Sequence, residues 1–117
     1  MEIKNCDRLG QGKGLFATKF YRKGTIVHTL NGMYLNAPTK YSIYVGEGMH
    51  IEDPLGIYIN HSSDPTTYVC GKNIIAKSDL QIDDEITFDY NENEINMAAP
   101  FYDGKGNYIC GKKRIII

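Results

Sequence analysis

Short segments rich in β-branched and aromatic residues recur along the whole chain, each bounded by glycine, proline or charged turns. Three of them are Gly24–Leu30, Tyr41–Val45 and Asn73–Ala76. Such runs are typical of β-strands. No segment of the sequence combines a long helical period with caps, although residues 54–59 could form one helical turn and residues 91–99 two. The sequence therefore predicts a mostly β fold built from short strands.

One of these segments, Glu85–Tyr90, ends in a tyrosine. In an extended conformation Ile86, Phe88 and Tyr90 share one face, and the two residues between them share the other. This pattern predicts a strand whose apolar face finishes in a phenol. A hydroxyl placed at the end of an apolar face is a candidate reactive group.

A second polar group precedes a turn at Asp64-Pro65. Asn60 and His61 together offer several hydrogen-bond donors and acceptors, and Ser62 adds a hydroxyl, so the three could hold a polar small molecule. Proline then ends the segment sharply, because the residue before it is excluded from the helical region. An ordinary Asx or Ser turn in a surface loop is the alternative for this segment taken alone.

Alternating glycines precede a short apolar strand in residues 10–17. Glycine lets a backbone approach a ligand closely. The segment lacks the third glycine and the following helix of a dinucleotide-binding fingerprint, so it does not indicate that class of site.

Taken together and in this order, the three segments resemble the motifs of SET-domain protein lysine methyltransferases. Gly12–Ala17 is similar to the glycine motif of the family, Tyr58–Ser62 to its Asn-His-Ser motif, and Glu85–Tyr90 to its last motif. The resemblance implies one SET domain over residues 1–117, a β-clip-like fold of several small sheets, and a C-terminal pseudoknot in which the tail passes through a loop.

The resemblance also implies a function and a set of site residues. The family transfers methyl groups from S-adenosylmethionine to protein lysines, so the partner would be a basic, lysine-containing protein segment, with a histone tail as one candidate. Residues 31–54 would form the variable insert beside the substrate groove. The implied cofactor-binding residues are Gly12, Lys13, Gly14, Asn60, His61 and Tyr90, the catalytic residue is Tyr90, and the substrate channel contains Tyr58, Phe88 and Tyr44.

Lysine must lose a proton before it can accept a methyl group, because its pKa in water is roughly 10.4. A narrow apolar channel favours the neutral amine by burial. Tyr90 is expected to orient the reacting groups rather than to act as a base, since a phenol pKa of roughly 10 suits that role poorly. Phe88 lies two residues before Tyr90, where the family resemblance implies di- or trimethylation for phenylalanine and monomethylation for tyrosine.

The three cysteines, Cys6, Cys70 and Cys110, are odd in number and widely spaced, which indicates thiols in a reducing compartment. Many SET enzymes bind zinc through a cysteine of the Asn-His-Ser loop and a tail triplet. Here Ser63 occupies the loop position and the tail keeps Cys110, whereas structural zinc needs four ligands. We therefore predict no metal and a tail that does not close over the cofactor as in those relatives.

Charge is distributed unevenly although the net charge is only -1. Residues 78–104 contain no Lys or Arg, and the acidic residues Asp79, Asp83, Asp84, Glu85, Asp89, Glu92 and Glu94 accumulate around the proposed catalytic strand. An acidic neighbourhood would attract a basic peptide, and a solvated acidic turn is the alternative.

The C-terminal end has the opposite sign, with Lys105, Lys112, Lys113 and Arg114 followed by Ile115–Ile117. This pattern favours a packed terminal strand over nucleic-acid binding. The isoleucines leave a homodimer open. The chain shows no apolar run of membrane-spanning length and no signal peptide, so an intracellular protein of the cytoplasm or nucleus is expected.

Two other functions remain open at this stage. The reduced tail is compatible with a catalytically inactive SET-like binding module. His50-x-Glu52 and His61-x-x-Asp64 could instead supply two histidines and a carboxylate to iron in a small β-barrel oxygenase.

Overall fold

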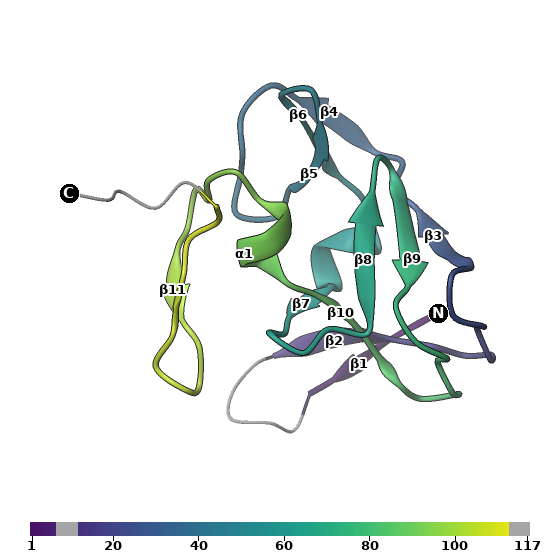
Figure 1. Cartoon of the computed structure of the whole chain (residues 1–117). Coiled ribbons are helices and arrows are strands. Elements are labelled where there is room, and N and C mark those ends of the chain that lie inside the picture. Colours follow the sequence, from purple (N-terminus) through teal and green to yellow (C-terminus); the bar gives the residue numbers. More distant parts are fainter. Residues whose placement is uncertain (7–11, 113–117) are drawn as a thin grey trace.

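The computed structural model of the chain describes residues 1–6 and 12–112. It has the predicted mostly β architecture of several small sheets (Figure 1). The strands are β1 (Glu2–Asn5), β2 (Lys13–Phe16), β3 (Ile26–Thr29), β4 (Met33–Leu35), β5 (Ile43–Gly46), β6 (Met49–Glu52), β7 (Asn60–His61), β8 (Thr67–Cys70), β9 (Asn73–Ala76), β10 (Glu85–Phe88), β11 (Phe101–Tyr102) and β12 (Tyr108–Ile109). The helical elements are a 3-10 turn, η1 (Gly56–Tyr58), and a one-turn helix, α1 (Tyr90–Asn93).

A four-stranded sheet with the order β1-β2-β10-β7 brings the three sequence motifs together. Strand β2 carries the glycine motif and pairs antiparallel with β10, with Leu15 opposite Ile86. On its other side β10 pairs parallel with β7, with Thr87 opposite Asn60 and Phe88 opposite His61. Segments that are far apart in the sequence therefore become adjacent strands of one sheet.

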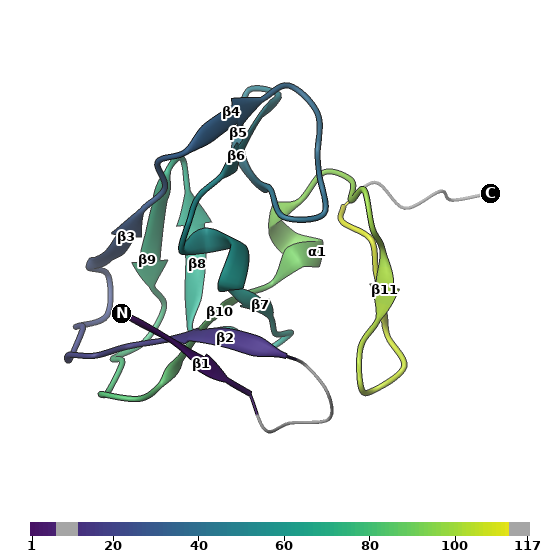
Figure 2. The same cartoon turned by 180° about the vertical axis from the view of Figure 1, so that it is seen from behind.

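Two three-stranded sheets complete the body of the molecule, with the orders β3-β9-β8 and β4-β6-β5. The second of these lies within residues 31–54, the predicted insert, and forms a separate small layer beyond β3 and β9 (Figure 2). The expected strands at residues 24–30, 41–45 and 73–76 correspond to β3, β5 and β9.

The core lies between these sheets and is aliphatic except for one aromatic ring. Its buried members are Leu15, Val27, Leu30, Ile43, Ile51, Ile59, Ile74, Ala76, Leu80, Ile86 and Phe88. Central strand β10 is buried on both faces, because Thr87 on the second face is only 7% exposed. Its hydroxyl accepts a hydrogen bond from the Thr66 amide at 3.1 Å, which satisfies the buried polar atom.

The strand that was expected to reach Tyr90 ends at Phe88 instead. Asp89 acts as the N-cap of α1, where its carboxylate accepts a hydrogen bond from the Asn91 amide at 2.9 Å. Tyr90 is therefore the first helical residue rather than the last strand residue. The helix expected over residues 91–99 is also shorter than two turns, since Glu94 returns to an extended conformation.

The C-terminal part turns back along α1 and forms the β11–β12 hairpin, which projects beside the helix in both views (Figures 1 and 2). Asn91 Oδ1 accepts hydrogen bonds from the amides of Cys110 and Gly111, both at 3.0 Å. The predicted threading of the tail through a loop stays a prediction. The predicted terminal strand falls on residues 113–117, which lie outside the described residues. Within the described ranges, no helix is both long and apolar enough to span a bilayer.

Candidate functional site

Asn60 connects the Asn-His-Ser motif to the glycine motif. Its Nδ2 amide donates to the Lys13 carbonyl oxygen and to Glu85 Oε2, each at 3.0 Å, and lies 3.6 Å from Cys6 Sγ. A hydrogen bond to a carboxylate is stronger than one between neutral groups. Because these contacts use the NH₂ group, the Asn60 carbonyl oxygen is the polar atom left for a ligand.

The glycine motif owes its composition to close packing around Asn60. A Cβ atom on Gly14 would lie 2.7 Å from Cys6 Sγ, 2.8 Å from Glu85 Oε2 and 3.1 Å from Asn60 Nδ2. Gly12 has a φ of +72°, a left-handed conformation that L side chains rarely adopt. Of the motif's predicted cofactor residues, the described cleft lining includes Lys13 but neither Gly12 nor Gly14.

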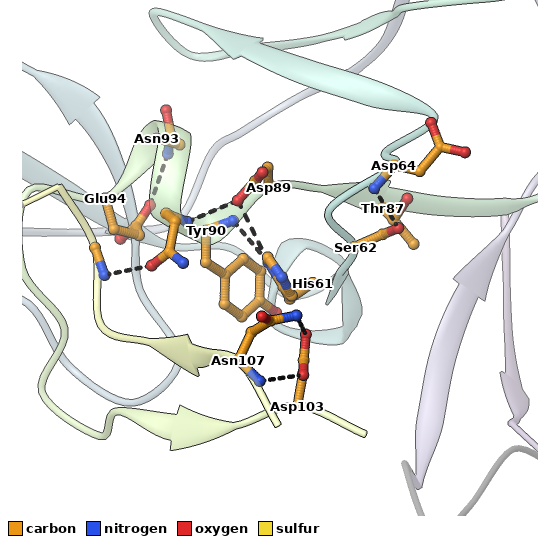
Figure 3. Close-up of polar contacts among 12 residues, drawn as sticks. His61, Ser62, Asp64, Thr87, Asp89, Tyr90, Asn93, Glu94, Asp103 and Asn107 are labelled. Carbon is orange, nitrogen blue, oxygen red and sulfur yellow. Dashed lines mark hydrogen bonds and ion pairs between the residues drawn. The ribbon is translucent and has the colours of Figure 1, made fainter. Parts of the chain in front are cut away.

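His61 is buried and held by the residue that starts α1. Its side chain is 5% exposed, and its Nδ1 accepts a hydrogen bond from the Tyr90 amide at 3.0 Å (Figure 3). The ring proton of the neutral imidazole therefore lies on Nε2. Burial lowers the pKa of His61 and so keeps the ring neutral, although the negative charges of Asp89 and Asp103 act in the opposite direction. Among the described residues Nε2 has no hydrogen-bond partner, so it is a buried donor available to a ligand.

The Tyr90 ring is partly buried between His61 and Phe88, with centroid distances of 5.2 and 4.8 Å. Its hydroxyl donates a hydrogen bond to the Ile59 carbonyl oxygen. Burial, and then the negative charges of Glu94 and Glu85, raise the pKa of Tyr90. The phenol is therefore neutral and held in place, and its proton is already used in a hydrogen bond. The lone pairs of its oxygen can still accept a hydrogen bond from a ligand.

These residues face one cleft with a volume of about 860 Å³. The cleft is lined by Lys13, Lys40, Tyr41, Ile57, Tyr58, Asn60, His61, Tyr90, Phe101, Tyr102, Asp103 and Gly104. Its size lies within the range of small-molecule sites, roughly 300 to 1,000 Å³. Lys13 of the glycine motif, the Asn-His loop and the tyrosine thus converge at a single concave surface.

The tail lines one side of this cleft, and whether it closes over a cofactor stays a prediction. Phe101 of β11 lies with its ring centroid 6.3 Å from that of His61 and 6.2 Å from that of Tyr90. The Asp103 carboxylate accepts a hydrogen bond from the amide of Lys105 at 2.9 Å and so shapes the hairpin turn. It also accepts from the amide of Asn107 at 2.9 Å (Figure 3). The Asp103-Gly104 pair between Phe101-Tyr102 and Tyr108-Ile109 was the available sequence signal for this hairpin.

A narrow cavity of about 40 Å³ adjoins the cleft, because Lys40, Tyr41, Ile57 and Tyr90 line both. Its wall consists of Thr39, Lys40, Tyr41, Ser42, Ile43, Gly56, Ile57, Ile59, Phe88, Tyr90, Glu94, Met97, Ala98 and Ala99. A volume of this size accommodates about three groups as large as water. The shape suits the end of a thin, unbranched side chain.

The predicted channel residues divide between three places. Phe88 lines the narrow cavity, whereas Tyr58 lines the cleft. Tyr44 belongs to neither described lining, because its ring packs against His50 at 5.1 Å and its hydroxyl accepts from the Gly48 amide at 3.3 Å. Tyr41, three residues earlier, lines both spaces instead.

Glu94 is the site residue that sequence reasoning did not single out. In the sequence Glu94 is one of the acidic residues around the proposed catalytic strand. In the structure it is 4% exposed and lines the narrow cavity. Burial raises the pKa of Glu94 to about 7, although hydrogen bonds from the Tyr44 amide and Asn93 oppose this shift. The acidic residues therefore do not form one surface, and Asp83, for example, pairs with Lys4 at 3.0 Å.

The arrangement proposed for an iron site does not form. His50 lies in β6 of the insert sheet and His61 in β7 of the four-stranded sheet. Across residues 1–6 and 12–112, no group of three or more His, Cys, Asp and Glu side chains is placed to hold a metal ion.

Comparisons with known proteins give a likeness in structure only. No protein-family model matches the sequence, and no curated protein does. A solved structure of a humanized mutant of the Chaetomium thermophilum Polycomb Repressive Complex 2 bound to the inhibitor GSK126 matches 93% of this chain and 18% of that chain, with a TM-score of 0.62 and 18% identity. A structure of ctPRC2 in an autoinhibited conformation bound to S-adenosylmethionine matches 93% of this chain and 19% of that chain, with a TM-score of 0.65 and 18% identity.

The chain thus spans less than a fifth of the length of the chains it matches. An identity of 18% shows the fold. The fold is SET-like, in agreement with the resemblance found in the three motifs.

Proposed function

We propose that this chain is an S-adenosylmethionine-dependent methyltransferase that acts on the side chain of a protein lysine. The observation that carries the proposal is the junction of a ligand-sized cleft with a narrow aromatic cavity at Tyr90. Two substrates that enter from different sides of the molecule would meet at this point.

The cleft residues fit S-adenosylmethionine. His61 Nε2 is a buried donor without a partner among the described residues, and Asn60 retains a carbonyl acceptor. The rings of Tyr58, Tyr90 and Phe101 offer aromatic faces and edges to an adenine and a sulfonium. When bound, this group supplies an electrophilic methyl on a positively charged sulfur. The residues that would hold it are Lys13, through its backbone, with Tyr58, Asn60, His61, Tyr90 and Phe101.

The narrow cavity fits the end of a lysine side chain. Phe88 is 2% exposed and Ile59 also 2% exposed, so the wall there is apolar. Burial against such a wall disfavours an ammonium and lowers its pKa from roughly 10.4. Lysine is also long and unbranched, which matches a cavity of about 40 Å³ better than the planar guanidinium of arginine does.

Tyr90 is proposed to align the reacting amine rather than to deprotonate it. Its hydroxyl proton is directed at the Ile59 carbonyl oxygen, and its raised pKa keeps the phenol neutral. The oxygen lone pairs can accept from an amine N–H. Alignment of this kind contributes strongly to rate, because a misplacement of about 1 Å can reduce it by roughly 100-fold.

Phe88 supports the further proposal that the product is di- or trimethyl-lysine. Its ring packs against Tyr90 at 4.8 Å and carries no hydroxyl that could hold a water or the amine. The space beside the amine is therefore free for methyl groups already added. A histone tail is one candidate substrate, and an intracellular location, a homodimer and the absence of nucleic-acid binding stay predictions of the sequence.

The experiment combines cofactor binding with methyl transfer. Calorimetry would measure S-adenosylmethionine affinity, and a radiolabelled transfer assay would use histones and a cell-protein extract as acceptors. We expect binding and transfer, with Tyr90→Phe lowering the rate by about 100-fold at unchanged cofactor affinity. Tyr68→Phe is the matched control, because Tyr68 lies on β8 and is 47% exposed.

Absence of cofactor binding would refute the proposal. Cofactor binding without transfer to any acceptor would instead assign the chain as a binding module. Transfer that Tyr90→Phe leaves unchanged would remove Tyr90 from the catalytic role.

A further inference from the structure

Glu94 is the one acidic side chain in the described lining of the narrow cavity. It follows α1 directly, four residues after Tyr90, and its amide donates to the Tyr90 carbonyl oxygen at 2.9 Å. The rest of the wall is mixed, with Met97, Ala98 and Ala99 on the same segment and Thr39, Lys40 and Ser42 on another. A carboxyl group in such a place loses much of its hydration, so its position needs a reason.

The carboxyl group is fixed from two directions. The Tyr44 amide of β5 donates to both oxygens, at 3.2 Å to Oε1 and 3.0 Å to Oε2. Asn93 Nδ2 donates to Oε2 at 2.6 Å. A carboxylate has about four lone-pair sites, so this arrangement leaves Oε1 able to accept from a further donor.

We infer that Glu94 binds the ammonium end of the substrate lysine in the narrow cavity and takes one proton from it. The inference rests on the proposed function, since it assigns a further residue to the same site. In the step, one N–H bond of the ammonium breaks and an O–H bond forms on Glu94. The electron pair stays on nitrogen, which gives a neutral amine and a neutral carboxylic acid.

The electrostatics of the cavity favour this direction of transfer. A base operating near neutral pH works best with a pKa close to 7, and burial raises the pKa of Glu94 to about that value. The same burial lowers the pKa of a lysine from roughly 10.4. Two neutral groups are also easier to keep at a buried position than two charges.

Tyr90 cannot supply this function, because its hydroxyl already donates to Ile59 and its pKa is raised. The other titratable groups around Glu94 come from several elements. They are Lys40, Tyr41 and Tyr90 in the described lining of the cavity, Tyr44 on β5, and Lys112 of the tail, the last two joined to Glu94 through their amides.

Binding can be tested without the methyl donor. Carbon-13 NMR of protein labelled at glutamate carboxyl carbons would follow the titration of Glu94, assigned by the signal missing in Glu94→Gln. Butylamine, which is an ammonium ion at neutral pH, serves as the probe, and 1-butanol is its uncharged match. We expect tens of millimolar butylamine to lower the titration midpoint, because a nearby cation favours the carboxylate. No shift, or an equal shift with 1-butanol, would overturn the inference.

The proton-accepting role is tested by rate. Glu94→Gln should lower kcat by roughly 100-fold or more, and should remove the rise of kcat/KM with pH that ends near pH 7. Glu94→Asp should restore part of that rise. Glu92→Gln is the matched control, since Glu92 lies on α1, two residues before Glu94, and is exposed.

The outcomes separate this inference from the proposed function. Full activity and an unchanged pH profile in Glu94→Gln would reject the role of Glu94 and leave the methyltransferase intact. Failure of methyl transfer to every acceptor, with butylamine still bound beside Glu94, would reject the proposed reaction and retain an ammonium-binding site.

Discussion

Replacing Asn60 by aspartate tests whether its amide joins the glycine motif to the Asn-His loop. The two side chains have nearly the same shape, but aspartate has no donor. In the native structure Nδ2 lies 3.0 Å from both the Lys13 carbonyl oxygen and Glu85 Oε2. The substitution would therefore place a carboxylate oxygen against two acceptors, one of them charged.

The expected loss of stability has two parts. A hydrogen bond to a charged partner contributes about 1.5–3 kcal/mol, and this part disappears at neutral pH. Repulsion between two partly buried carboxylates about 3 Å apart adds up to roughly 5 kcal/mol with an effective dielectric constant near 20. The pair relieves most of this by taking up a proton, so we expect a total of about 4 kcal/mol at pH 7.5.

Acid should restore stability to this variant. Repulsion raises the folded-state pKa of the carboxyl pair above the unfolded value of about 4. The penalty is therefore absent below that value and grows as pH rises through the folded-state pKa. At pH 4 the pair can share a proton in an O–H···O hydrogen bond, and we expect a loss of only about 1 kcal/mol.

Urea denaturation at pH 7.5 and pH 4 measures both quantities. Asn73→Asp is the matched control, because Asn73 Oδ1 accepts from the Thr29 hydroxyl at 2.9 Å and aspartate keeps that acceptor. It introduces the same charge and should change the free energy of unfolding by less than about 0.5 kcal/mol. Equal destabilisation of Asn60→Asp at the two pH values, or a loss no larger than the control, would contradict the assigned contacts.

Two further predictions concern the narrow cavity. Phe88→Tyr adds a hydroxyl to the wall of a cavity of about 40 Å³. Mass spectrometry of the modified peptide should therefore show monomethyl-lysine with the variant and di- or trimethyl-lysine with the native protein. Monomethyl-lysine as the final product of the native protein would reject the proposal. Folding raises the pKa of Glu94 to about 7, so the free energy of unfolding should fall by about 3 kcal/mol as pH rises from 4 to 7. Urea titrations of Glu94→Gln should not show this pH-dependent loss of stability. An identical pH slope in both proteins would show that Glu94 does not titrate there.

The sequence was most informative where local chemistry determines local structure. Segments rich in β-branched residues became β3, β5 and β9, and Asp64-Pro65 follows the Asn-His pair after two serines. The convergence of Asn60, Lys13 and Tyr90 followed from a family resemblance and not from periodicity. It depends on parallel pairing of β7 with β10, whose partners Asn60 and Thr87 lie far apart in the chain.

Other features depended on contacts that no local pattern contains. Tyr41 and Tyr44 are equally suitable lining residues by composition, and the choice between them is made by β5, which starts at Ile43 and turns Tyr44 toward His50. Glu94 appeared to be a solvated acid because its neighbours in the sequence are polar. In the structure its carboxylate is buried and accepts a hydrogen bond from a backbone amide 50 positions away, at Tyr44.

Glu94 also links the parts of the molecule that must cooperate at the cavity. Its carboxylate accepts from the insert at Tyr44, its amide donates to Tyr90 of α1 at 2.9 Å, and its carbonyl oxygen accepts from the Lys112 amide of the tail at 2.7 Å. A residue used only to join these segments would gain nothing from a charge, because an uncharged amide can also accept from a backbone N–H. Ionisation of this buried carboxyl group lowers the stability of the fold. A role of its proton in the reaction would explain why a protein keeps such a destabilising group. The fall in the free energy of unfolding with rising pH and the proposed proton transfer therefore both follow from the burial of this carboxyl group.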